Sequence, residues 1–192
     1  MEDNMIINIQ DPQKGTVPYD LNEGMEFSTF QSTLKENGHN LIKIADIVKD
    51  PEKMPGYTYA RTPNADNDWS KVEQWAYTIV VEGRIAKIGM TEKTLASRFS
   101  SYQAGTRKNR NKGTCSVTNF YCSEFIRECL TKGWKIELYA YSVPKQRFEI
   151  DVMGSTTEVV GKYAYVFEDA FLREHKNTHG TLPPLCRNSS LT

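Results

Sequence analysis

The sequence lacks several features that define whole classes of protein. Among its 192 residues, no apolar run approaches the roughly 18 residues that a membrane-spanning helix needs. The first residues, MEDNMIINIQDPQKG, are acidic and polar and contain no signal-peptide core. The chain shows no internal repeat and no long low-complexity segment. With 39% hydrophobic and 25% charged residues, we expect one cytoplasmic globular domain that makes no contact with a membrane.

Cysteine and histidine are also scarce. The four cysteines, Cys115, Cys122, Cys129 and Cys186, suit a reducing compartment in which thiols stay free. A zinc site built from Cys115, Cys122, His175 and His179 is conceivable, but the spacing does not match the usual zinc patterns. The alternative is buried thiols and surface histidines, with a catalytic or DNA-contacting role for His175 or His179 left open.

The chain has no excess charge of either sign. Its 24 basic residues balance 24 acidic ones, so a nucleic-acid binder of this composition must gather its basic residues on one face. One run of the sequence concentrates basic residues and contains no acidic one: Arg107, Lys108, Asn109, Arg110, Asn111 and Lys112. The cations would neutralise phosphates and the two asparagines would contact base edges. The alternative is a solvated basic loop.

The chain divides near residue 70. Residues 1–24 are polar and rich in turn residues, residues 26–36 have the apolar spacing of a helix, and residues 51–70 form a loop rich in proline and asparagine. We assign residues 1–70 to an N-terminal extension that clamps DNA or forms a subunit contact. Residues 71–192 are assigned to the main domain.

The main domain begins with two predicted strands, WAYTIVV and RIAKIG, on either side of a turn at Glu82-Gly83. A helix follows from about Thr91, which would cap it, and a second helix from about Ser123. A strand at WKIELYAYSV, a polar excursion and a last helix at residues 163–177 complete the order. Two strands, two helices, a strand and a helix in this order predict an α+β domain.

The register of the first hairpin decides which side chains meet. A two-residue turn would pair Tyr77 with Ile88 and point Lys87 to the opposite face. A three-residue turn, Val81-Glu82-Gly83, would place Tyr77 directly opposite Lys87. We favour the three-residue turn, because Gly83 then occupies the left-handed position that such a turn requires.

An arginine borders the apolar stripe of the following helix. Arg98 lies three residues after Leu95 and four after Thr94, so it stands beside the face that packs on the sheet. An arginine at such a place either extends to solvent or holds an anion.

The order of these residues resembles the GIY-YIG nuclease family. The residues AYT stand for the first motif and KIG, ten residues later, for the second; Arg98 follows in the next helix. Glu168 lies on the last helix and Asn188 near the end of the chain, as the family expects. The first motif lacks its glycine and isoleucine, and Lys87 replaces the second tyrosine, as in a branch that includes Type II restriction endonucleases.

This resemblance implies a small domain with a central antiparallel sheet flanked by helices, and metal-dependent hydrolysis of phosphodiester bonds. Glu168 would hold one Mg²⁺ or Mn²⁺. Arg98 would bind the scissile phosphate, and Asn188 would fix the terminal loop or contact that phosphate. Tyr77 would orient or deprotonate the attacking water, with its pKa lowered by the nearby cations Lys87 and Arg98.

The expected activity is that of a Type II restriction endonuclease on double-stranded DNA. Cleavage of both strands at a palindrome needs two active sites, so we expect a homodimer. A phage or repair nuclease specific for DNA structure, and a DNA-binding module without catalysis, remain as alternatives.

Overall fold

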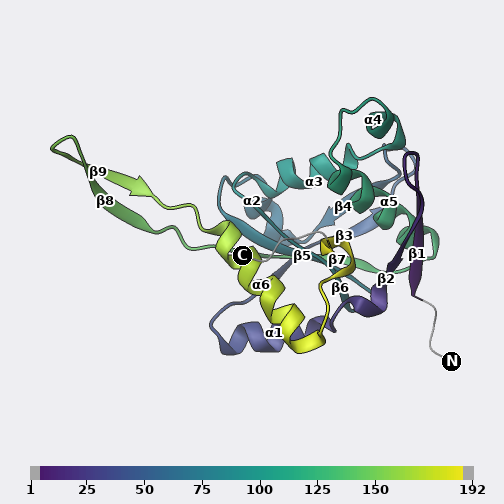
Figure 1. Cartoon of the computed structure of the whole chain (residues 1–192), viewed down its shortest axis with the longest axis horizontal. Helices are drawn as coiled ribbons and strands as arrows, with labels where there is room; N and C mark the ends of the chain where they lie inside the picture. The colour runs from purple at the N-terminus through teal and green to yellow at the C-terminus, as the bar shows by residue number, and fades with distance from the viewer. Residues whose placement is uncertain (1–4, 188–192) are drawn as a thin grey trace.

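A five-stranded antiparallel sheet forms the centre of the computed structural model, which describes residues 5–187 (Figure 1). The strands are β1 (Ile6–Asp11), β2 (Gly15–Asp20), β3 (Ile42–Lys49), β4 (Tyr57–Arg61), β5 (Trp75–Val81), β6 (Arg84–Thr91), β7 (Ile136–Ser142), β8 (Arg147–Val152) and β9 (Ser155–Val160). The α-helices are α1 (Phe27–Glu36), α2 (Asp66–Trp69), α3 (Leu95–Gln103), α4 (Arg107–Asn111), α5 (Val117–Thr131) and α6 (Ala164–His179). Short 3₁₀ turns are η1 (Leu21–Glu23), η2 (Pro63–Ala65) and η3 (Pro184–Cys186).

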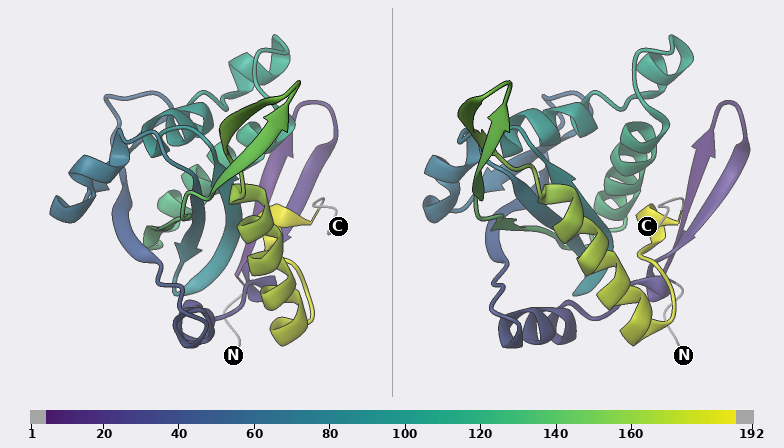
Figure 2. Two further views of the ribbon diagram at one scale, coloured as in Figure 1. Left: turned by 90° about the vertical axis from the view of Figure 1, so that its left-hand side faces the viewer. Right: turned by 60° about the vertical axis from the view of Figure 1, so that its left-hand side comes forward.

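Helices cover both faces of this sheet, whose strand order is β4-β3-β7-β5-β6 (Figure 2). Apolar residues of α3, α5 and the β1–β2 hairpin pack on one face, around the side chains of Tyr77 and Ile79. Residues of α1 and α6 pack on the other face, around Ala76 and Ile88. The predicted α+β class with a central antiparallel sheet is thereby confirmed.

The sheet extends on both sides of residue 70. Strands β3 and β4, from the segment assigned to the N-terminal extension, join β5–β7 in one sheet. The β1–β2 hairpin forms a separate two-stranded sheet. It is attached to α5 through Asp11, whose buried carboxylate accepts a hydrogen bond of 2.6 Å from the hydroxyl of Tyr121. The role of residues 1–70 as DNA clamp or dimer contact stays a prediction.

The helix starts differ from the predicted ones. Helix α3 begins after Thr94, whose hydroxyl accepts a hydrogen bond from the Ser97 amide, and not after Thr91. Helix α5 begins after Ser116. The predicted cap Ser123 is buried within α5, where its hydroxyl accepts a 3.4 Å hydrogen bond from Tyr57.

The polar excursion after β7 is a protruding ribbon of β8 and β9 (Figure 1). All residues of both strands are exposed. The apolar side chains of Phe148, Ile150 and Val152 alternate with polar ones along β8, so one face of the ribbon is apolar and solvent-exposed. None of the helices within residues 5–187 is long and apolar enough to cross a membrane.

Candidate active site

The β5–β6 hairpin places Tyr77 and Lys87 on one face of the sheet, by a route that the sequence did not predict. Its turn has two residues, Glu82 and Gly83, both with positive φ, so the favoured three-residue turn is wrong. A β-bulge then shifts the register: Ile79 pairs with Lys87, and Tyr77 pairs with Gly89. Because side chains alternate along a strand, this shift returns Lys87 to the face that bears Tyr77.

Gly89 leaves the space that the phenol of Tyr77 occupies. A Cβ atom at this position would lie 2.5 Å from both Cζ and the hydroxyl oxygen of Tyr77. The glycine in KIG is therefore required by the close approach of the tyrosine ring to the neighbouring strand.

Arg98 and two tyrosines form a hydrogen-bonded cluster. The Nε of Arg98 donates to the hydroxyl of Tyr77 at 2.7 Å, and a terminal guanidinium nitrogen donates to the hydroxyl of Tyr102 at 3.0 Å. The two hydroxyl groups share a further bond of 2.6 Å. Both tyrosines are fully buried. Of five guanidinium N–H groups, these contacts use two, so Arg98 keeps donors for a ligand.

The predicted lowering of the Tyr77 pKa is wrong. Burial raises the pKa of Tyr77, and the opposing influence of Arg98 and Lys87 does not offset it. Sequence spacing showed the two cations but not the complete burial of the ring. At neutral pH Tyr77 is therefore a phenol and not a phenolate.

Lys87 is a buried cation with a sulfur partner. Only 6% of the residue is exposed, and its Nζ lies 3.3 Å from the Sγ of Cys186. Burial alone would lower the pKa of Lys87, but the neighbouring Cys186, Cys122, Tyr77 and Glu168 together raise it. The side chain consequently keeps its positive charge.

Glu168, on α6, lies within the electrostatic influence of Lys87 and Arg98. Burial raises the pKa of its carboxyl group, while Lys87 and Arg98 act to lower it. Within residues 5–187, the Glu168 carboxylate has no hydrogen bond and no ion pair. A partly buried carboxylate without a partner, close to two cations, has free oxygen atoms for a hard divalent cation.

The cysteines and histidines considered for a zinc site do not form one in the described residues. No group of three or more His, Cys, Asp and Glu residues lies together in the part of the chain that the structure describes. His175 is fully buried: its Nδ1 donates to the carbonyl of Thr181 at 2.8 Å and its Nε2 accepts from the amide of Met25 at 2.9 Å. The expected surface position is wrong for His175, and both of its nitrogens serve the fold. The predicted Asn188 lies outside the described residues.

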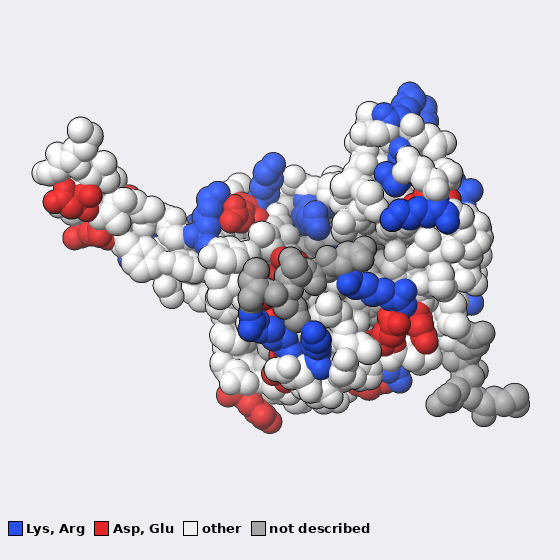
Figure 3. Space-filling view, in the orientation of Figure 1, with Lys and Arg blue, Asp and Glu red and all other residues white. Residues whose placement is uncertain are grey.

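The basic run forms the short helix α4 and not a loop. Figure 3 shows basic side chains gathered over this helix. Arg107 lies 3.4 Å from the carboxylate of Glu124, and Arg110 donates to the side chain of Gln13 at 2.7 Å. Asn109 donates to a main-chain carbonyl. The exposed Lys108, Asn111 and Lys112 side chains have no partner within residues 5–187. They are the residues of α4 and its C-terminal end that are free to contact a ligand.

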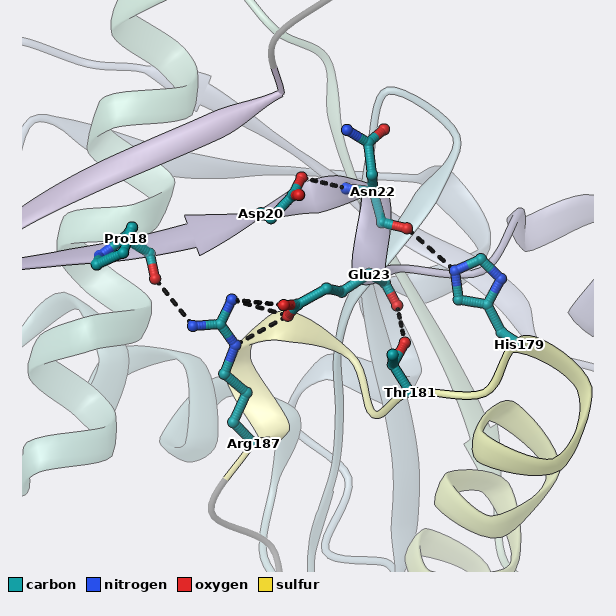
Figure 4. A network of polar contacts seen from close by, with 7 residues as sticks. All are labelled: Pro18, Asp20, Asn22, Glu23, His179, Thr181 and Arg187. Carbon is teal, nitrogen blue, oxygen red and sulfur yellow. Dashed lines mark hydrogen bonds and ion pairs between the residues drawn. The ribbon is translucent and has the colours of Figure 1, made fainter. Parts of the chain in front are cut away.

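A polar network ties the C-terminal segment to the N-terminal one (Figure 4). Arg187 makes two hydrogen bonds of 2.8 Å to the carboxylate of Glu23 and one of 2.9 Å to the carbonyl of Pro18. The hydroxyl of Thr181 donates to the carbonyl of Glu23. These bonds hold the segment around η3 against β2 and η1. A separate contact ties Cys186 to β6, where its Sγ donates to the carbonyl of Ile88 at 3.2 Å.

Sequence reasoning missed two members of this site. Tyr102 was not among the predicted site residues, although its spacing of four from Arg98 places the two on one face of α3. Cys186 gave no signal, because it meets Lys87 across 99 residues of sequence.

Among the comparisons with known proteins, only the search of solved structures found similar chains. No protein-family model matches the sequence, and no curated protein matches it. Among solved structures, the chain is similar to restriction endonuclease HPY188I in complex with product DNA, with 21% identity, a TM-score of 0.55, and coverage of 88% of this chain and 90% of that one. A mutant of bacteriophage T4 EndoII aligns with 20% identity, a TM-score of 0.48, and coverage of 76% and 93%. The likeness to HPY188I shows a common fold.

Proposed function

We propose that this chain is a metal-dependent endonuclease of the GIY-YIG family that hydrolyses phosphodiester bonds of double-stranded DNA. Type II restriction in the cytoplasm, as a homodimer, is the activity we assign to it. The observation that carries this proposal is the electrostatic coupling of Arg98, Tyr77, Lys87 and Glu168. The Glu168 carboxylate has no hydrogen bond or ion pair within residues 5–187. The fold shared with a restriction endonuclease supports it.

The cations would bind and polarise the scissile phosphate. Arg98 is already oriented by the two tyrosines, and its free N–H groups would donate to non-bridging phosphate oxygens. Lys87 would add charge from within the protein, where the low dielectric strengthens its effect. Both groups would stabilise the charge that builds up as water attacks.

Tyr77 would orient the attacking water as a neutral phenol. Its raised pKa makes orientation the better supported of the two roles predicted for it, because a phenolate base is disfavoured by burial. The water oxygen would form the new bond to phosphorus while the bond to the leaving sugar oxygen breaks. The water's proton would pass to solvent, and the leaving oxygen would take a proton from solvent to become a hydroxyl group.

Glu168 would hold the divalent cation, Mg²⁺ or Mn²⁺. One carboxylate, with water and substrate oxygens as the remaining ligands, is a common arrangement for Mg²⁺. Such an ion supplies positive charge to the phosphate and to the leaving oxygen. The role of Glu168 is to fix this charge beside the phosphate that Arg98 and Lys87 bind.

Cleavage of a plasmid tests the proposal. Purified protein with Mg²⁺ should cut plasmid DNA of several sequences into discrete fragments. Glu168→Ala should lose about 10²-fold or more of the activity while binding DNA as the wild type does. Cleavage confined to branched DNA would favour the structure-specific alternative. Binding without cleavage over a titration of Mg²⁺ and Mn²⁺ would contradict nuclease function.

A further inference from the structure

A cavity of about 320 Å³ adjoins Lys87 on the side where the N-terminal hairpin lies. Residues of the β1–β2 hairpin, the first turns of α5 and the segment around η3 line it, with Lys87 among them. The cluster residues Tyr77, Arg98 and Glu168 do not line it. Its volume is at the small end of the roughly 300–1,000 Å³ typical of ligand pockets, and it is larger than a bare phosphate needs.

The charge of this cavity favours an anion. Lys14, Lys87 and Arg187 line it, and among residues 5–187 no carboxylate does. Arg187 is neutralised by Glu23, whereas the exposed side chain of Lys14 has no partner within residues 5–187. Lys87 donates one of its three N–H groups to the Sγ of Cys186. Two lysines therefore have donors available for a ligand.

The cavity also has apolar lining residues. Val17, Tyr19, Val117 and Leu185 contribute to its lining. Val117 is 39% exposed although it is aliphatic, and Tyr19 is fixed by its ring contact with Tyr121, at a centroid distance of 5.7 Å. A ligand that fills this space needs an anionic end and a less polar body.

We propose that the cavity binds one nucleotide of the DNA strand, the neighbour of the scissile phosphate. Its phosphate lies between Lys14 and Lys87, and its sugar and base lie against the apolar lining. This inference rests on the proposed nuclease function, because Lys87 is shared between the cavity and the reacting phosphate. It gives the β1–β2 hairpin a defined part in holding the substrate strand.

Binding of thymidine 5′-phosphate to the full chain in EDTA tests the cavity without any cleavage. Calorimetry should show tighter binding of this nucleotide than of thymidine or inorganic phosphate. Lys14→Ala should weaken binding about tenfold through loss of a charged hydrogen bond. The matched control is Lys35→Ala, at an exposed lysine on α1, a helix that contributes no residue to the cavity lining.

A second pair of variants changes the charge without removing a cation. Val117→Glu places a carboxylate at the cavity and should lower the affinity at least as much as Lys14→Ala, whereas Val117→Gln, of nearly equal size, should retain binding. Position 117 is the first residue of α5, where glutamate is favourable to the helix, so neither variant should unfold the chain. Excess duplex DNA should displace the nucleotide, because the strand occupies the same place.

The outcomes separate this inference from the proposed function. Equal affinity for nucleotide and inorganic phosphate, or equal binding by Val117→Glu and Val117→Gln, would overturn the cavity assignment even if the protein cuts plasmid. Nucleotide binding that duplex DNA does not displace would overturn its assignment to the substrate strand. Binding that responds to Val117→Glu in a protein that cuts no DNA would support the nucleotide site and refute the nuclease.

Discussion

The charged form of Glu168 lowers the stability of the folded chain. Burial raises its pKa above the ordinary value of 4.5, so the folded chain holds this proton to a higher pH than the unfolded chain does. The protonated Glu168 carboxyl thus contributes to the free energy of unfolding at pH values below the pKa that it has in the unfolded chain. This contribution is lost as the pH rises through the pKa that Glu168 has in the folded chain. At neutral pH, without metal, the charged carboxylate therefore destabilises the fold.

Glu168→Gln should consequently stabilise the protein in EDTA at pH 7, by about 1–3 °C in melting temperature. The gain should vanish below about pH 4, where the wild-type carboxyl is also protonated, and Mg²⁺ should raise the melting temperature of the wild type only. Calorimetric scans over pH measure both effects. A lower melting temperature for the variant at pH 7 would mean that Lys87 and Arg98 stabilise the carboxylate more than burial penalises it.

Cys186 is the residue that we expect to position Lys87. Its Sγ accepts from Lys87 Nζ at 3.3 Å and from the amide of Ile88 at 3.4 Å, and only 1% of the Cys186 residue is exposed. Cys186→Ala removes the neighbour that most opposes the effect of burial on the lysine pKa. We expect kcat to fall about tenfold and the basic limb of the pH profile to move to lower pH.

Cys186→Ser is the matched control for this prediction. A hydroxyl keeps an acceptor beside Lys87, so it should restore most of kcat. The basic limb should stay at the lower pH of the alanine variant, because Cys186 acts on the lysine pKa through charge and a serine hydroxyl supplies none. Equal losses in the alanine and serine variants, with an unchanged pH profile, would show that the thiol matters only for packing of η3.

At the scale of elements, the β5–β6 hairpin holds the site through the contact between Gly89 and Tyr77. Gly89→Ala places a methyl group 2.5 Å from the phenol, whose hydroxyl is fixed by Arg98 and Tyr102. The ring must move, so we expect a loss of about 1–3 kcal/mol in stability and a strong loss of cleavage. A double-mutant cycle with Tyr77→Ala measures the coupling, because the clash disappears with the ring. Additive effects would contradict this explanation.

Parts of this hairpin could be predicted from sequence and parts could not. Alternating apolar residues placed both strands, but the turn depends on Glu82 adopting positive φ. A glutamate adopts that conformation here because its main-chain N–H and its carboxylate both bond to the main chain of Lys135, a residue distant in sequence. The bulge that returns Lys87 to the Tyr77 face likewise follows from pairing in the sheet and has no local signature.

Other elements were missed for related reasons. Strand β4 was assigned to a loop because prolines and glycine surround it, yet its pairing with β3 defines it. The β8–β9 ribbon did carry a period-two signal in Phe148, Ile150 and Val152, which its charged residues concealed. Among site residues, motif order identified Tyr77 and Arg98, whereas burial and long-range contacts, which decide the pKa of Tyr77, are properties of the folded chain.

At the scale of the whole molecule, the described chain brings one cluster of Tyr77, Lys87, Arg98 and Glu168 together, so one chain would cut one strand at a time. We therefore expect cleavage of both strands to use two copies, related by a two-fold axis if the site is palindromic. Sedimentation of the protein with its DNA should give the mass of two chains per duplex.

Mixing wild type with an excess of Glu168→Ala protein tests whether each active site of a dimer cuts one DNA strand. Mixed dimers carry one competent cluster, so they should nick supercoiled plasmid and accumulate open circles, whereas wild type alone should proceed to linear DNA. The yield of open circles should rise with the proportion of the variant, because mixed dimers then outnumber wild-type dimers. If the mixture gives only slower linearisation without open circles, each duplex is cut by one chain acting twice, and the dimer would be unnecessary for the chemistry.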